Sequence, residues 1–297
     1  MVARRTSGAS GLRTLAAQVR QLLAEVTAQI DDVIGRPHPS PESLHELHRS
    51  MRRLRHALAL WTRVLRPPDR AISKPLDRRL ARLARLIGRV RDRDVMLALL
   101  EDGDLPRPRG PDVAAVARLR ARWRDDARTG REVLRVFLRS ERDAHLFEQI
   151  GAAITLTPRT DRPIRLAELL DEEAQARAER VRGAQKKARR KGSVARLHRL
   201  RIQVRRLRHL NELRSRLEPD RAATPPPVVR RLQSQLGHLH DLDLVLEGVG
   251  PALTATAWGE ALRAQRRRLR RAIATTIRER RWPWRATSPS GSGARPS

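Results

Sequence analysis

A thirteen-residue pattern occurs twice in this chain, and the repetition constrains the fold more than any other feature. Residues 44–56 read LHELHRSMRRLRH and residues 197–209 read LHRLRIQVRRLRH, so eight of thirteen positions are identical. A second pattern follows each copy, LIGRVRDRDVML at 86–97 and QLGHLHDLDLVL at 235–246. The equivalent positions in it are Gly88 and Gly237, Asp92 and Asp241, and Asp94 and Asp243. Because both patterns recur in the same order, we interpret the chain as an internal duplication.

Each copy of the first pattern has the spacing of an amphipathic helix. Apolar side chains recur every three or four residues and predict a buried stripe, formed by Leu44, Leu47, Met51, Leu54, Leu58 and Trp61 in one copy and by Leu197, Leu200, Val204 and Leu207 in the other. Cationic side chains begin on the neighbouring face, within a sector of about 80° in the first copy. We call them the first ridge (His45, His48, Arg49, Arg52, Arg53, Arg55 and His56) and the second ridge (His198, Arg201, Arg205, Arg206, Arg208 and His209).

The charge balance indicates a polyanionic ligand. Lys and Arg total 64 against 33 acids, which gives a net charge of +31, and only four of these cations are lysines. Such an excess costs self-repulsion in the compact state. Arginine suits phosphate because its planar guanidinium donates two parallel hydrogen bonds to one phosphate group. Ridges that face each other across a pseudo-twofold axis would line one groove, so we expect both to bind a single polyanion.

The same residues resemble the CHAD domain, the conserved histidine α-helical domain. The family pattern is His, Arg three residues later, a β-branched residue at the next position, and Arg-Arg-Leu-Arg starting seven residues after the His. The second copy fits this pattern with His198, Arg201, Ile202, Arg205, Arg206, Leu207 and Arg208. The first copy departs at His48, where the family usually has arginine, and at Arg49, where it has an aliphatic residue. In the later pattern His240 replaces the arginine found at Arg91. The resemblance covers about residues 10 to 282 and implies an all-helical, two-lobed domain that binds inorganic polyphosphate, with no established catalytic activity.

Other functional classes have less support. The chain has no cysteine, no run of 18 apolar residues and no signal peptide, so we expect a soluble cytoplasmic protein, with polyphosphate granules as one candidate location. Few aromatic residues argue against stacking on single-stranded nucleic acid. Duplex nucleic acid is the alternative ligand, because its phosphates can also accept hydrogen bonds from arginine. We expect such binding to be weak and independent of base sequence. No catalytic residue, cofactor or metal site is expected, and a phosphatase or kinase acting on polyphosphate is the third class.

The acidic residues of the later pattern are predicted to orient arginines. The support residues are therefore Arg91, Asp92, Asp94, His240, Asp241 and Asp243. Gly88 is interpreted as a close helix crossing or a kink.

The chain as a whole is predicted to be all-α, with two antiparallel helical bundles related by the duplication. We place an N-terminal bundle at 10–156, a C-terminal bundle at 163–282 and a disordered tail at 283–297. Ser40 and Ser193 are candidate N-caps of the two motif helices. The helix after Val113 is expected to break near Gly130 and Ser140.

Overall fold

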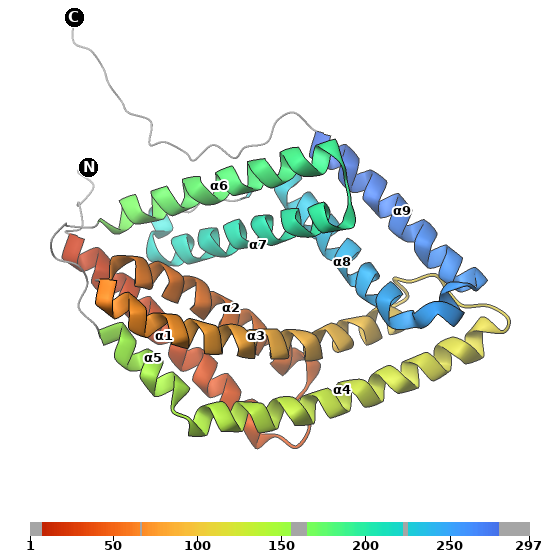
Figure 1. The fold of residues 1–297 in the computed structure, drawn as a ribbon, viewed down its shortest axis with the longest axis horizontal. Helices are drawn as coiled ribbons and strands as arrows, with labels where there is room; N and C mark the ends of the chain where they lie inside the picture. Colours follow the sequence, from red (N-terminus) through yellow and green to blue (C-terminus); the bar gives the residue numbers. More distant parts are fainter. Residues whose placement is uncertain (1–7, 66, 156–164, 222–224, 279–297) are drawn as a thin grey trace, which may run out of the picture. The chain divides into compact units, whose positions relative to one another are not determined.

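The computed structural model is all-α, and it describes residues 8–65, 67–155, 165–221 and 225–278 (Figure 1). No strand occurs within these ranges. The helices are α1 (Gly8–Gly35), α2 (Pro41–Val64), α3 (Pro67–Glu101), α4 (Asp112–Asp143), α5 (Leu146–Thr155), α6 (Leu166–Arg190), α7 (Val194–Leu217), the 3₁₀ turn η1 (Pro219–Arg221), α8 (Pro227–Thr254) and α9 (Ala257–Arg278). None of the described helices combines the length and apolar character needed to cross a bilayer.

The two motif helices begin where the sequence predicts. Ser40 precedes α2 in extended conformation, and its Oγ accepts a hydrogen bond from the backbone N–H of Ser43 at 3.1 Å, with Pro41 at the first helical position. Ser193 precedes α7 in the same backbone conformation, but its hydroxyl makes no capping bond. The α7 start therefore lacks one stabilising contact that α2 has.

The predicted stripes are buried except at Leu58, which is partly exposed. Leu44, Leu47, Met51 and Leu54 have no exposed surface, and Trp61 is 3% exposed. In α7 the stripe is buried over its whole length, from Leu197 to Leu207. Each such side chain contributes about 1.5–3 kcal/mol when removed from water. This burial fixes which face of each motif helix stays exposed.

Cα packing divides the chain into two compact units, which we describe separately. Unit 1 contains residues 1–165 and 239–268, and unit 2 contains residues 166–238 and 269–297. The helices α8 and α9 each have residues in both units.

In unit 1, α2 packs against α1 and α3, and α3 packs against α4. Gly88 lies within α3 without breaking it, and the His48 ring lies over it. A Cβ added at Gly88 would be 3.4 Å from His48 Nε2, so this glycine marks a close helix crossing. Gly130 similarly faces Val90, and α4 continues through it, so the predicted break there is wrong. The break occurs at Ala144 and His145, where the His145 φ is 53°.

Residues 239–268 belong to unit 1 because they complete one of its cores. The cluster contains Met96, Leu105, Val116, Leu119, Trp123, Leu242, Val245, Val249, Trp258 and Leu262. The backbone N–H of Trp258 donates to Asp112 Oδ2 at 3.0 Å, and its indole N–H donates to the Pro106 carbonyl at 2.6 Å. The compact units therefore differ from the consecutive bundles at 10–156 and 163–282. The predicted tail at 283–297 lies outside the described residues.

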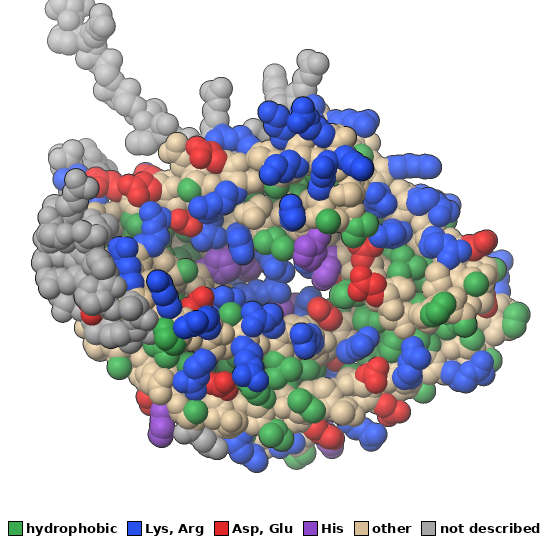
Figure 2. Space-filling model, in the orientation of Figure 1, with side chains coloured by type: hydrophobic (Ala, Val, Ile, Leu, Met, Phe, Trp, Pro, Cys, Tyr) green, Lys and Arg blue, Asp and Glu red, His purple; other side chains and the backbone are tan. Residues whose placement is uncertain are grey.

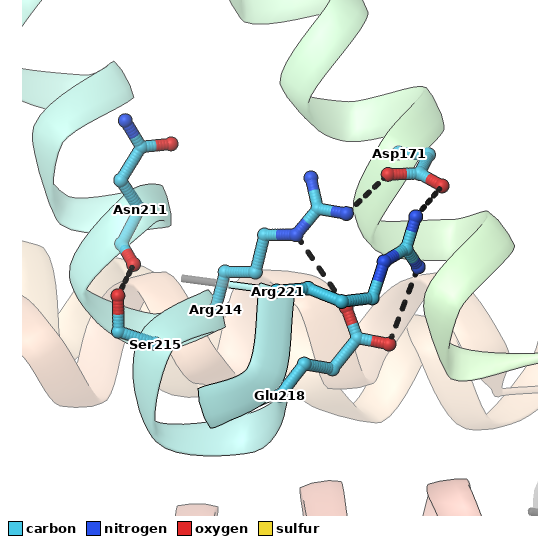
Figure 3. A network of polar contacts seen from close by, with 6 residues as sticks. All are labelled: Asp171, Asn211, Arg214, Ser215, Glu218 and Arg221. Atoms are coloured by element: carbon cyan, nitrogen blue, oxygen red, sulfur yellow. Dashed lines mark hydrogen bonds and ion pairs between the residues drawn. The ribbon is translucent and has the colours of Figure 1, made fainter. Parts of the chain in front are cut away.

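Unit 2 is organised around the hairpin of α6 and α7 (Figure 1). A polar network closes its open end, where Asp171 of α6 accepts hydrogen bonds from Arg214 and, at 3.0 Å, from Arg221 of η1 (Figure 3). Glu218 lies 3.4 Å from Arg214 Nε and 3.6 Å from Arg221 Nη1. Because these carboxylates bridge three elements, they hold the end of α7 against α6.

Candidate functional site

The first ridge lies on the side of α2 that the buried stripe leaves exposed. His45 and Arg49 are exposed, and Arg52, Arg53, Arg55 and His56 are partly exposed. The helix thus presents cationic side chains over about three turns next to an apolar stripe with no exposed surface at Leu44 or Leu47.

A second helix contributes a cation to this ridge at His45. Arg91 of α3 donates from Nε to His45 Nδ1 at 3.3 Å, which requires an unprotonated Nδ1. The pKa of His45 is lowered from its ordinary value, first by partial burial and then by the positive charges of Arg91 and Arg49; Glu46 opposes the shift. His45 is therefore an imidazole held neutral among guanidinium groups.

His48 does not join this exposed group, contrary to the sequence prediction. It is 4% exposed, and its ring fills the space above Gly88 between α2 and α3. A bound chain of phosphates would have no access to it without separating the two helices. We therefore remove His48 from the proposed contact residues.

Acidic neighbours partly neutralise the first ridge. Arg49 pairs with Glu46 at 3.3 Å, and both side chains are nearly half exposed. Arg55 reaches across to Asp77 of α3 at 3.2 Å. His56 Nδ1 bonds to the Arg52 carbonyl at 2.7 Å, which fixes its ring along the helix. Exposed pairs of this kind are weak, about 0–1 kcal/mol, so a phosphate can replace the carboxylate at small cost.

The second ridge lies on α7 in unit 2. His198, Arg206 and Arg208 are exposed, and Arg201 and Arg205 are partly exposed. His209 is the exception, because it is 4% exposed and its Nδ1 lies 3.1 Å from Glu212 Oε2. The exposed contact predicted for His209 is therefore not available, since the ring packs inward and is held by its own helix.

Three of the four motif aspartates lie beside arginines. Asp94 pairs with Arg131 of α4, and Asp243 pairs with Arg266 of α9 at 2.6 Å. Burial raises the pKa of Asp94, although the Arg131 guanidinium opposes this shift. Asp92 lies 3.6 Å from the guanidinium of Arg91. His240 and Asp241 are both partly buried.

Sequence reasoning missed the arginine partners of these aspartates. Arg131 follows Asp94 by 37 residues and Arg266 follows Asp243 by 23, so no shared spacing marks them. The common feature is topological, because each aspartate pairs with the helix that comes next in the chain.

Positive charge is not confined to the ridges. Figure 2 shows Lys and Arg side chains spread over the visible face, with fewer Asp and Glu among them. Charge alone therefore does not identify a binding site, and any test needs a control that removes equal charge elsewhere.

Comparison with known families agrees with the fold and the motifs. The sequence model of the CHAD domain family matches residues 13–250 of this chain. The chain belongs to the CHAD family. Among solved structures, the CHAD domain from the plant Ricinus communis is similar, with a TM-score of 0.62 and 22% identity over 91% of this chain and 92% of that one. At this identity the likeness shows the shared CHAD fold. A comparison with curated proteins gives no match.

Proposed function

We propose that this CHAD protein binds inorganic polyphosphate, without catalysis, through the ridges on α2 and α7. The observation that carries the proposal is the cluster around His45. Arg91 bonds to its ring, and the charges of Arg49 and Arg52 act on its pKa, so three guanidinium groups from two helices surround one imidazole. Glu46 and Asp92 offset part of this positive charge. Bringing the remaining like charges together is unfavourable unless a further anion lies among them.

Arginine is well suited to binding polyphosphate. Each phosphate along a polyphosphate chain offers oxygens that can accept two parallel hydrogen bonds from one guanidinium group. The first-ridge contacts that are exposed or partly exposed are His45, Arg49, Arg52, Arg53, Arg55 and His56, with Arg91 beside them. Those of the second ridge are His198, Arg201, Arg205, Arg206 and Arg208.

The proposal is tested by measuring polyphosphate and duplex DNA side by side at equal total charge, at about 150 to 300 mM salt. Polyphosphate should bind more tightly, because a flexible chain can follow a helix face from one guanidinium group to the next. Equal affinities with equal salt dependence would leave no reason to prefer polyphosphate. Incubating the protein with long-chain polyphosphate and Mg²⁺ tests the absence of catalysis, and chain shortening would contradict it.

A further inference from the structure

The turn between α6 and α7 carries a cationic surface outside both ridges. From Arg180 to Asn211 the chain has thirteen Lys and Arg and no Asp or Glu, the longest interval in the sequence without an acid. We call its exposed part before α7 the turn patch, formed by Lys186, Lys187, Arg189, Arg190 and Lys191, all exposed. Among the described residues, none of these five side chains has an acidic partner.

Arginines that are not in the patch hold the turn in place. Arg196 donates to the carbonyls of Lys187 and Lys191 at 3.3 and 3.4 Å, and Arg270 of α9 donates to the Gly192 carbonyl at 2.6 Å. The last carbonyls of a helix lack partners within the helix and carry partial negative charge. The carbonyls of Lys187 and Lys191 also accept backbone hydrogen bonds, from Lys191 and Ser193. The two arginines add to these bonds and bring further positive charge to the turn.

The residue types indicate what the turn patch can bind. Three of the four lysines in the chain are Lys186, Lys187 and Lys191. Lysine is a compact charge on a flexible stem, which suits phosphates at varying positions, whereas arginine favours fixed two-bond geometry. The patch has no aromatic or amide side chain to read a base. It therefore fits a phosphate backbone contacted without regard to sequence.

An anionic membrane is a poorer fit. Helices that lie on membranes bury a row of large apolar side chains beside their basic residues. In the described part of this hairpin, Val194 at 43% is the one exposed large apolar side chain. We propose that the turn patch binds duplex nucleic acid through its phosphates, separately from the ridges. A duplex carries its phosphates on the outside, so an exposed helical turn can lie against it.

The test uses the full chain and a fluorescent DNA duplex of about 30 base pairs, titrated from about 50 to 200 mM salt. The test variant is Lys186→Gln, Lys187→Gln and Arg190→Gln. The matched control is Arg267→Gln, Arg268→Gln and Arg271→Gln, which removes the same charge from three exposed positions of α9. Each lost phosphate contact lowers the slope of log affinity against log salt by about 0.9. The test variant should lose about 2 to 3 in slope and the control less than about 1.

Polyphosphate affinity, measured on the same proteins, separates this inference from the proposed function. Retained polyphosphate binding in the test variant, with weakened DNA binding, supports a separate surface. Equal losses of DNA binding in both variants, or no duplex binding by the wild type, would overturn the inference while leaving the ridges untouched. A parallel loss of both ligands would assign the turn patch to the polyphosphate surface instead.

Discussion

The two ridges come from the same sequence pattern but differ in the acidic residues that accompany the pattern in the sequence of each motif helix. Around α2, Glu46 pairs with Arg49, Asp77 with Arg55, and Asp92 lies beside Arg91. In α7 the first acid is Glu212, which pairs with Arg208 and His209 at the end of the ridge. Carboxylates therefore lie along the first ridge, whereas the α7 sequence has its first carboxylate only at the end of the second ridge.

The largest expected effect comes from reversing the charge at one arginine in each ridge, at equivalent positions of the pattern. Arg52→Glu with Arg205→Glu should weaken polyphosphate binding by about 100-fold or more, because each charge-assisted contact contributes about 1.5–3 kcal/mol. Isothermal titration calorimetry or competition with labelled polyphosphate measures the loss.

The control for that pair is Arg267→Glu with Arg271→Glu, two exposed positions of α9. It changes total charge equally and should cost only a few-fold. Circular dichroism must show wild-type helicity for both variants. Similar losses from the two pairs would mean that attraction is diffuse, and the ridges would have to be abandoned as the site.

His48 and Arg201 occupy equivalent positions of the pattern, and variants at these positions distinguish a packing role from a binding role. His48→Ala removes a buried ring between α2 and α3, so it should destabilise the fold by about 2 kcal/mol, because it leaves a cavity over Gly88. Arg201→Ala should leave stability within about 0.5 kcal/mol, as surface changes usually do, and weaken polyphosphate binding about tenfold. Urea unfolding and binding titrations provide the two readouts. Unchanged stability in His48→Ala would show that the ring does not support the helix crossing.

The two motif aspartates allow a similar comparison within unit 1. The Asp94 side chain is 7% exposed and that of Asp243 is 18% exposed, and each pairs with an arginine of the next helix. Asp94→Asn should cost about 1–2 kcal/mol of stability and Asp243→Asn about 1 kcal/mol, since the less exposed pair leaves the more desolvated arginine behind. Thermal unfolding of the two variants measures the difference. The reverse order would show that burial does not determine the strength of these pairs.

The smallest expected effect is a pH dependence that belongs to the first ridge. The pKa of free His45 is lowered from its ordinary value by partial burial and by the charges of Arg91 and Arg49. A bound polyanion should raise this pKa, because nearby negative charge favours the protonated ring. The complex therefore takes up a proton, and affinity should rise as pH falls, most steeply below about 6.5. We expect a gain of about two- to fivefold between pH 7 and 5.5, which affinity measurements in one buffer series detect.

His45→Gln should flatten this pH profile, while His198→Gln should keep the part due to His45. A wild-type profile that stays flat, or that survives in His45→Gln, would make His45 a structural residue. The Arg91 hydrogen bond and the nearby guanidinium charges are the reason why His45 is expected to carry this pH dependence.

Several features of the fold could be predicted from the sequence alone. Helical spacing predicted the buried stripes correctly in both motif helices except at Leu58, which is only partly buried. Ser40 with Pro41 predicted the start of α2. These predictions hold because apolar periodicity and capping act over a few residues. The CHAD family could be recognised from the same motifs for the same reason. The pseudo-twofold relation of the halves stays a prediction.

Other features depended on which helices meet. His48 and His209 have the sequence of exposed ridge residues, yet both are buried, because the space over Gly88 admits one ring and Glu212 holds the other. The sequence by itself determined the helices, their buried faces and the excess of positive charge, since these follow from composition and local spacing. Only the tertiary structure decided which cations face solvent, that Arg91 joins His45, and that residues 239–268 complete the core around Trp123, because each depends on contacts between residues far apart in the chain.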